Sequence, residues 1–401
     1  MSADSSGGAR RRPTLAAWVP TVLLVVLLLG PALVGARLFA AGDLIERQAP
    51  WAEASTVEHV TNSCVSDTID AALPHALSFR ARIADGDPAP LWESSASAGT
   101  ILGAAPFQGV VSPLFLATLP LPDVVFPAWL KLLEIGTVLL GTVLWARRLG
   151  LSTGAGLLGG FLYATGSFLV MWTGWPQTRT AAFFPLVFWA VERIVQDRTV
   201  RSALPLPLVV AGVALGGFPA IVVHTVYLAL AYGVVRLVVL NRRARADDAG
   251  TGARSAWHRW GRAPVLAAAG GLAGAALVAF QLVPWAQQLS ESVDLERRST
   301  AWRATVGWPE LLTTLYPQAL GSCATGEARW GSMIPVEGVS YVGAGAFVLC
   351  LAAFVMPTAS DRLGGVRTFL LAAAGLVLAM TFVGGGLNYV VQHLPGMAGS
   401  G

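Results

Sequence analysis

Residues 15–41 read LAAWVPTVLLVVLLLGPALVGARLFAA, an apolar run long enough to cross a bilayer as one helix of about 20 residues or more. The polar stretch before this run contains Arg10 to Arg12, a basic flank of the kind that stays in the cytoplasm. Because the run is too long for the core of a signal peptide, it predicts an uncleaved first transmembrane helix. Cleavage near the small residues Gly35 and Ala36 is the alternative.

The composition of the whole chain also indicates a membrane protein. Of 401 residues, 54% are hydrophobic and only 12% are charged, and the mean hydropathy is +0.61. Soluble domains carry about 25% charged residues. Half that share leaves too little polar surface to cover a water-soluble globule, so lipid must surround much of the chain. The net charge of +4 is small, and we assign the protein no nucleic-acid partner.

Further apolar runs along the chain predict an all-α polytopic membrane protein with about nine transmembrane helices. Some runs contain Gly or Pro, which membrane helices tolerate when neighbouring helices satisfy the freed backbone groups. The two runs on either side of Pro219 are short enough to form one helical hairpin. The expected spans are 15–41, 124–146, 153–172, 179–196, 203–217, 219–240, 264–285, 338–356 and 367–390.

Arginine clusters between these runs predict the orientation, because cytoplasmic loops retain Arg and Lys. With the N-terminus inside, the short basic loops all fall on the cytoplasmic side, and two long segments fall outside. The predicted organisation is a cytoplasmic N-terminus with the first helix (1–41), a first outer loop (42–123), helices two to seven (124–285) with a basic cytoplasmic loop (241–263), a second outer loop (286–336), and the last two helices with an outer C-terminal end (337–401).

The first outer loop is acidic and holds two aspartates in positions that suit chemistry. Asp43 lies where the first helix leaves the membrane, and Asp67 opens a stretch that leads into an amphipathic segment at residues 68–84. Such a segment lies flat at the lipid–water boundary. A carboxylate held there can act as a general base on a hydroxyl group or help to hold a divalent cation. Solvated surface acids are the plainer interpretation.

Four other polar residues have competing interpretations. Lys131 and Glu134 lie one turn apart in the second span and are expected to pair with each other rather than to bind substrate. His224 is expected to be a hydrogen-bonded residue of an apolar helix rather than a ligand. Glu337, at the start of a span, suits either a functional role or stabilisation of a helix N-terminus.

The three cysteines show no spacing typical of a zinc site. Cys64 and Cys323 both fall in outer segments, where disulfides are permitted. We predict a Cys64–Cys323 bridge between the two outer segments, and a free thiol at Cys350 within a helix.

Several short motifs follow one another in a fixed order. After Asp67 and Pro74 come DGDPAPLW at 85–92, RRLG at 147–150, WTGWP at 172–176, AVER at 190–193, GGFP at 216–219, PVE at 335–337 and YVG at 341–343. Their order and spacing resemble those of YfhO-type bacterial membrane proteins, over about residues 40 to 395. The YfhO-type proteins are similar to glycosyltransferases of the GT-C fold. The chain departs from the pattern where Trp92 is followed by Glu93-Ser94 instead of Asn-Pro. The resemblance ends at about Leu394-Pro395-Gly396, where family members usually continue, so we expect a truncated member of the family.

The resemblance implies a GT-C-like bundle whose large first outer loop carries interfacial helices. It implies transfer of a sugar from a polyprenyl-phosphate carrier to an envelope glycan or protein, on the outer face of a bacterial plasma membrane. The catalytic acid of such enzymes lies in the first outer loop. Asp67 is the first candidate because the Leu-Trp motif follows it at the family's distance, and Asp43 is the second because of its place beside the membrane.

The same resemblance suggests the remaining site residues. Arg297, Arg298 and Arg303 are candidates to stabilise the leaving phosphate. A divalent cation, Mg or Mn, would be held by Asp67 and Asp43. The other candidates for substrate binding are Glu337, His75 and Trp92.

Two rival functions remain open. One is a transporter or flippase of a lipid-linked substrate, which interrupted helices and repeated halves of the chain would indicate. The other is a non-catalytic scaffold of the cell envelope.

Overall fold

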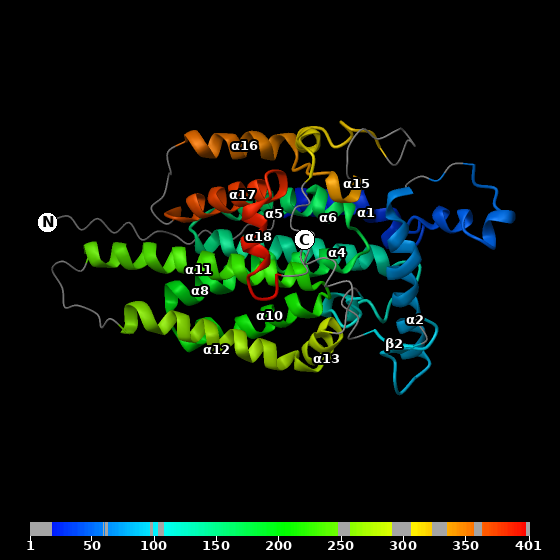
Figure 1. Ribbon diagram of the computed structural model, residues 1–401, viewed down its shortest axis with the longest axis horizontal. Coiled ribbons are helices and arrows are strands. Elements are labelled where there is room, and N and C mark those ends of the chain that lie inside the picture. Colours follow the sequence, from blue (N-terminus) through cyan, green and yellow to red (C-terminus); the bar gives the residue numbers. More distant parts are fainter. Residues whose placement is uncertain are drawn as a thin grey trace.

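The computed structural model describes residues 18–58, 60, 63–96, 99–102, 108–247, 257–290, 306–322, 335–356 and 363–397. In this part of the chain the regular secondary structure is helical except for one small hairpin, formed by β1 (Trp92–Glu93) and β2 (Thr100–Ile101). Helices α4 (Phe126–Arg148), α8 (Phe184–Asp197), α10 (Pro205–Leu215), α11 (Pro219–Asp247) and α12 (Arg262–Leu277) run along the long axis of a bundle (Figure 1). The predicted all-α membrane class agrees with this architecture.

Candidate membrane spans are fewer in the structure than in the prediction. Among the described residues, α4 and α11 are long and apolar enough to cross a membrane. Two bent pairs raise the number to four if each pair is one span: α12 with α13 (Ala279–Ser290), bent by 78°, and α17 (Val366–Phe382) with α18 (Gly386–Gln392), bent by 108°. The structure thus supports two to four spans of the predicted nine.

The other predicted spans are divided or short. Helix α1 covers Val19–Leu33, and α16 covers Ala344–Val355. The third predicted span is split into α5 (Thr153–Ala164) and α6 (Ser167–Met171), with Gly166 at the break. The fourth is split into α7 (Pro176–Ala182) and α8, and the fifth into α9 (Val200–Ala203) and α10. A proline in the first turn of α8 and of α10 explains why each begins anew, since proline has no backbone N–H to continue a preceding helix.

Helix α4 is the centre of the packing and contacts α5, α8, α7 and α1. Small residues let these helices approach closely. A Cβ on Gly141 would lie 2.8 Å from the backbone nitrogen of Leu186, and a Cβ on Gly156 would lie 2.8 Å from the Cα of Val143. Helices in membranes associate through such close backbone contacts, because lipid offers no hydrophobic driving force between them.

A buried polar network links α4, α8 and α11. Glu192 and Arg236 form an ion pair, and Tyr232 donates a hydrogen bond of 2.6 Å to Glu192. Trp145 of α4 donates to the Tyr232 hydroxyl at 2.9 Å, and Arg236 also donates to the carbonyl oxygen of Gly364 at 2.6 Å. The network therefore fastens the turn that precedes α17 to the middle of the bundle.

The predicted amphipathic segment 68–84 is helical, and it crosses one end of the bundle. It consists of η5 (Thr68–Ala72), a wider helical turn, which continues into α2 (Leu73–Ala84). Figure 1 shows α2 lying across the ends of the long helices. Arg80 of α2 is buried, pairs with Asp123 at 2.7 Å, and donates to the carbonyl oxygen of Thr118 at 2.9 Å and to that of Leu121. These bonds attach α2 to the chain just before α4.

The β1–β2 hairpin is attached to α2 through Glu93, whose side chain is buried. Ser78 and Ser95 each donate a hydrogen bond of 2.6 Å to this carboxylate, and Arg82 lies 2.7 Å from it. Burial alone raises the pKa of Glu93, but the hydrogen bonds from Ser78 and Ser95 and the charge of Arg82 outweigh it and lower the pKa to about 2. Glu93 is therefore a structural anion of the outer loop rather than a solvated surface acid.

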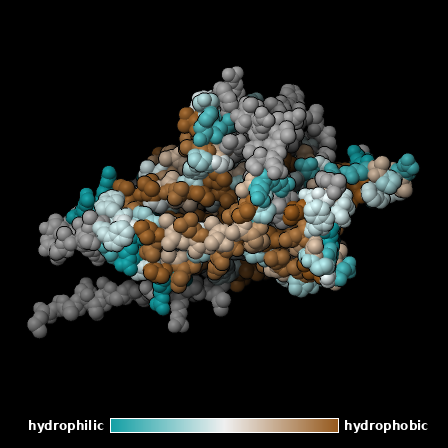
Figure 2. All heavy atoms as spheres, turned by 60° about the horizontal axis from the view of Figure 1, so that its bottom comes forward, coloured by the Kyte–Doolittle hydropathy of each residue, from teal (hydrophilic) through white to brown (hydrophobic). Residues whose placement is uncertain are grey.

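The surface agrees with a membrane environment. Figure 2 shows hydrophobic residues over the middle of the bundle and hydrophilic residues gathered toward its two ends. Helices α11 and α12 are consecutive, and Figure 1 places the end of the one and the start of the other at the end of the bundle far from α2. That end carries Arg242, Arg245 and Arg262, as a basic membrane face does. The cytoplasmic orientation of this end stays a prediction.

Candidate functional site

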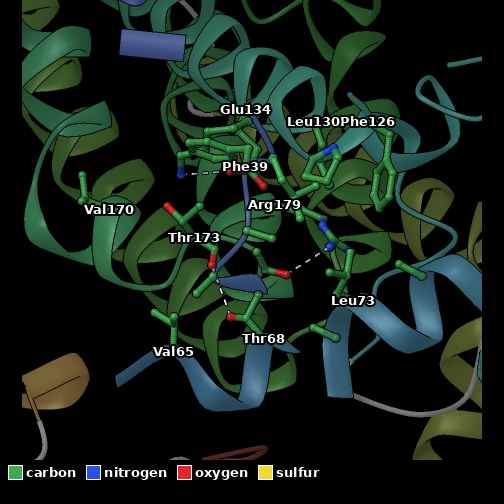
Figure 3. A pocket seen from close by; sticks show the side chains of 18 residues that line it. Phe39, Val65, Thr68, Leu73, Phe126, Leu130, Glu134, Val170, Thr173 and Arg179 are labelled. Atoms are coloured by element: carbon green, nitrogen blue, oxygen red, sulfur yellow. Dashed lines mark hydrogen bonds and ion pairs between the residues drawn. The ribbon is translucent and has the colours of Figure 1, made fainter. Parts of the chain in front are cut away.

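A cavity of about 340 Å³ lies at the end of the bundle that α2 crosses. Its walls come from the chain that follows α1, from η5 and α2, from the first turns of α4, and from the α6–α7 connection. Figure 3 shows Thr68 and Leu73 on one side and Glu134 and Arg179 on the other, all directed toward the cavity. The lining residues are mostly apolar: Leu38, Phe39, Ala40, Ala41, Val65, Thr68, Ala72, Leu73, Ala76, Phe126, Pro127, Leu130, Lys131, Glu134, Val170, Thr173, Gly174 and Arg179.

Three charged side chains, Lys131, Glu134 and Arg179, line this apolar cavity, and we call them the charged floor. All three are buried. The Nζ of Lys131 lies 3.1 Å from the Oε2 of Glu134, and Thr178 donates a hydrogen bond of 3.0 Å to the Oε1 of Glu134. Lys131 also donates to the carbonyl oxygen of Leu169. The predicted pairing of Lys131 with Glu134 is confirmed, and the pair also faces a cavity, which was not predicted.

Arg179 is held at the floor by α7, which begins at Pro176. Its Nη1 donates to the carbonyl oxygens of Gln108 and Gly109, both at 3.1 Å, and its guanidinium lies 5.5 Å from the centre of the Phe115 ring. Its Nε has no hydrogen-bond partner among the described residues, although the side chain is only 3% exposed. Buried donors in native proteins are nearly always satisfied, so this N–H has an unused capacity to donate a hydrogen bond.

The charges of the floor do not cancel. Lys131 and Arg179 carry two positive charges, and Glu134 carries one negative charge. No other described residue that lines the cavity is ionisable. A net positive charge in an apolar surrounding is unfavourable unless an anion compensates it. The cavity is therefore suited to an amphiphile with an apolar tail and an anionic head group.

The roof of the cavity rests on the α6–α7 connection. Thr68 of η5 donates a hydrogen bond of 3.4 Å to the carbonyl oxygen of Thr173. The next residue, Gly174, has a φ of +91°, and a Cβ there would lie only 2.5 Å from the Cγ2 of Thr68. Glycine is required at this position both for the backbone conformation and for the close approach of η5.

The two predicted catalytic aspartates lie beside the cavity and do not line it. Asp67 is exposed and immediately precedes Thr68, a lining residue. Asp43 is half-buried on η2 (Gly42–Arg47), two residues after the lining residue Ala41. Helix η2 contacts η5, so both aspartates belong to the same corner at the end of the bundle that α2 crosses. Their role as base stays a prediction.

The predicted metal site does not gain a ligand set. The described residues contain no group of three or more His, Cys, Asp and Glu side chains that could hold a metal ion. Asp43 and Asp67 alone are too few protein ligands for the dedicated cages typical of calcium, and magnesium uses such pairs only together with substrate oxygens. We therefore derive no step through a metal.

The other predicted substrate-binding residues among those described do not line the cavity. His75 is half-buried on α2, with its Nδ1 2.6 Å from the carbonyl oxygen of Ala71. Trp92 is exposed on β1 and covers Gly99, where a Cβ would lie 2.5 Å from the indole ring. Glu337 was expected at the start of a spanning helix. It is instead exposed on a separate short helix, α15 (Pro335–Gly338). The helical conformation ends at Gly338, and the next helix, α16, begins only at Ala344.

Some predicted residues cannot be placed. Arg297, Arg298 and Arg303 lie outside the described residues, and so does Cys323. Cys64 is disulfide-bonded, and Cys350 is an exposed free thiol. Helix α15, which lies close to the predicted second outer loop, contacts η4 (Ser63–Val65), which contains Cys64. The pairing of Cys64 with Cys323 stays a prediction.

Sequence reasoning missed Arg179 and the role of the Lys131–Glu134 pair in the cavity. A signal was present, because charged residues within apolar segments are costly and often functional. Because Lys131 and Glu134 were expected to pair with each other, neither was predicted to belong to a site. His224, as predicted, is hydrogen-bonded within its helix, with its Nδ1 2.6 Å from the carbonyl oxygen of Ala220.

Comparison with known proteins adds no assignment: no protein-family model, no curated protein and no solved structure matches the chain. The likeness to YfhO-type proteins and to the GT-C fold therefore stays an expectation from the motifs.

Proposed function

We propose that the protein is a membrane glycosyltransferase that transfers a sugar from a polyprenyl-phosphate carrier to a cell-envelope acceptor at the outer face. One observation carries the proposal: an apolar cavity with a positively charged floor lies under a helix that crosses the end of the bundle, close in the chain to Asp43 and Asp67. A polyprenyl-phosphate sugar has the matching parts, namely an apolar chain, an anionic phosphate and a polar sugar.

The donor binds with its phosphate at the charged floor and its chain along the apolar walls. Leu38 and Val170, which line the cavity, are 49% and 50% exposed, so the apolar lining continues onto the outer surface of the bundle. This continuity supports entry of the lipid from the side, with its chain still in the bilayer. Lys131 and Arg179 would face the phosphate, where positive charge stabilises the negative charge that develops on a leaving group.

The transfer itself needs a base near the cavity. An acceptor hydroxyl attacks the anomeric carbon of the sugar, a new carbon–oxygen bond forms, and the bond from that carbon to the phosphate oxygen breaks. The electron pair of the broken bond leaves with the lipid phosphate, and the hydroxyl proton goes to a carboxylate. Asp43 and Asp67 are the candidates for this carboxylate, because each follows or precedes a lining residue closely in the chain.

The test uses the purified protein in lipid nanodiscs with polyprenyl-phosphoryl hexoses and pentoses that carry a labelled sugar, together with an envelope fraction as acceptor. We expect the label to leave the lipid. Loss of the base, by Asp43→Asn or Asp67→Asn, should slow transfer by about a hundredfold or more. Ala72→Phe should block the cavity, and Ala71→Phe, one residue outside the lining, is its control. Full transfer by both aspartate variants and by Ala72→Phe would refute the proposal.

A transporter of a lipid-linked substrate is the second candidate. The two bent helix pairs, α12 with α13 and α17 with α18, favour it, because interrupted helices are common at the binding sites of transporters. The same labelled donors distinguish the two functions. In transport the sugar stays on the lipid and changes leaflet, whereas in transfer it appears on the acceptor.

A further inference from the structure

Glu134 has no role in the transfer as outlined, yet it is the one acid of the charged floor among the described lining residues. We propose that Glu134 is a specificity-determining residue that restricts the cavity to lipids with a single phosphodiester charge and disfavours lipid diphosphates. This inference rests on the proposed function, because it concerns the head group of the same donor.

The geometry keeps Glu134 in place as a fixed negative charge. Its side chain is 3% exposed, and both of its oxygens are engaged, Oε2 by Lys131 at 3.1 Å and Oε1 by Thr178 at 3.0 Å. It lies on α4, one turn after Lys131, and α4 is the most extensively packed helix of the bundle. A rigid helix therefore holds the carboxylate beside the head-group position.

The balance of charges in the occupied cavity determines which head group is favoured. With Lys131, Arg179 and Glu134 ionised, the floor carries one net positive charge. A phosphodiester brings one negative charge and leaves the occupied cavity neutral. A diphosphate diester brings two, and the occupied cavity then holds one uncompensated negative charge in apolar surroundings, which is strongly unfavourable. Replacing Glu134 by an uncharged residue raises the net charge of the floor to two and removes this penalty.

The experiment measures affinities for two probes that share one tail, farnesyl methyl phosphate with one charge and farnesyl methyl diphosphate with two. The full chain in nanodiscs is titrated with each probe, and the ratio of the two dissociation constants is the readout. We expect the unmodified protein to prefer the monophosphate. Glu134→Gln should shift the ratio toward the diphosphate by about tenfold or more. If Glu134 had only a structural role, Glu134→Gln would weaken the binding of both probes and leave the ratio of their dissociation constants unchanged.

Matched variants separate charge from structure. Glu134→Asp keeps the charge, and Thr178→Val removes one hydrogen bond to Glu134 but no charge, so both should keep the original ratio. The double variant Lys131→Met with Glu134→Gln leaves Arg179 as the single charge of the floor and should restore the monophosphate preference. If Glu134→Gln does not fold, Lys131→Met alone still tests the inference, because it lowers the net charge to zero and should move the ratio further toward the monophosphate.

The outcomes separate this inference from the proposed function. A ratio that stays the same in the unmodified protein, in Glu134→Gln and in Lys131→Met would overturn the inference alone, provided that the probes bind. An unmodified protein that binds neither probe would contradict the proposed function, and this inference with it.

Discussion

Arg236 and Glu192 form a two-point ion pair in the interior of the bundle: Nη2 lies 2.6 Å from Oε1, and Nε lies 2.8 Å from Oε2. The side chains are 1% and 0% exposed, so neither charge has water as a substitute partner. Two parallel hydrogen bonds of this kind fix the relative position of α8 and α11 as well as neutralising the charges.

Breaking this pair should strongly destabilise the fold. Arg236→Met leaves the carboxylate of Glu192 buried and without its cation, and should lower the free energy of unfolding by about 3–5 kcal/mol. Unfolding in detergent, followed by tryptophan fluorescence, measures the change. The exposed pair Arg148–Asp197, at 2.9 Å, is the matched control, and Arg148→Gln should cost about 0–1 kcal/mol. Equal effects of the two variants would contradict the importance of burial here.

Glu93 should make the outer loop sensitive to acid only at low pH. Its folded pKa of about 2 lies below the ordinary value of 4.5, so its ionised form stabilises the fold. That contribution is complete above about pH 4.5 and is lost as the pH falls through about 2. Hydrogen exchange of the hairpin amides, measured between about pH 5 and about pH 2, follows this loss of stability. Glu93→Gln should remove this pH dependence, and an unchanged pH profile in the variant would contradict the assignment.

Two glycines of α4 should respond differently to alanine. A Cβ on Gly141 would meet the backbone of α8 at 2.8 Å, whereas a Cβ on Gly136 would meet nothing within 4 Å. Gly141→Ala should therefore separate the helices and lower stability by about 1–3 kcal/mol. Gly136→Ala should be neutral or raise stability by up to about 1 kcal/mol, because alanine favours helices more than glycine does. Thermal unfolding of the two variants in the same detergent makes the comparison, and equal melting temperatures would rule out the close contact.

Cysteine chemistry should show one reactive thiol. Cys350 is exposed and free, and Cys64 is disulfide-bonded, so alkylation without reductant should label Cys350 alone. Intact-mass measurement should then find one adduct before reduction and three after it, because the chain has three cysteines. A peptide map that joins Cys64 to Cys323 would establish the predicted pairing. Three adducts without reductant would contradict it.

The apolar pattern of the sequence predicts the helical class and most helix positions well. Predicted spans at 124–146 and 219–240 correspond to α4 and α11, and the amphipathic segment 68–84 is a helix across the end of the bundle. Hydrophobicity is a property of each residue and its neighbours in the chain, so it can be read locally. The breaks at Gly166 and before Pro205 are also local, but the bend angles between the pieces depend on packing.

The cavity could not be predicted in the same way, because its walls come from four separate parts of the chain. Arg179 shares no periodicity or motif with Lys131, and only the fold brings them to one cavity. The acidic residues of the predicted first outer loop favoured Asp43 and Asp67 as site residues. The buried charges lie in apolar segments, and the expected pairing of Lys131 with Glu134 gave no reason to place these two in a site. Glu93 was a further miss, since a sequence does not show that Ser78, Arg82 and Ser95 converge on it.

The two ends of the η5–α2 segment, which lies along one side of the cavity, are attached unequally. Arg80 ties α2 to the chain before α4 through an ion pair at 2.7 Å and two further hydrogen bonds, whereas among the described residues η5 is joined to the α6–α7 connection by one hydrogen bond of 3.4 Å from Thr68. The α2 end of the segment is therefore the more firmly held of the two. A cross-link between positions 68 and 173 would hold the η5 end as firmly as Arg80 holds the α2 end, without altering Lys131, Glu134 or Arg179.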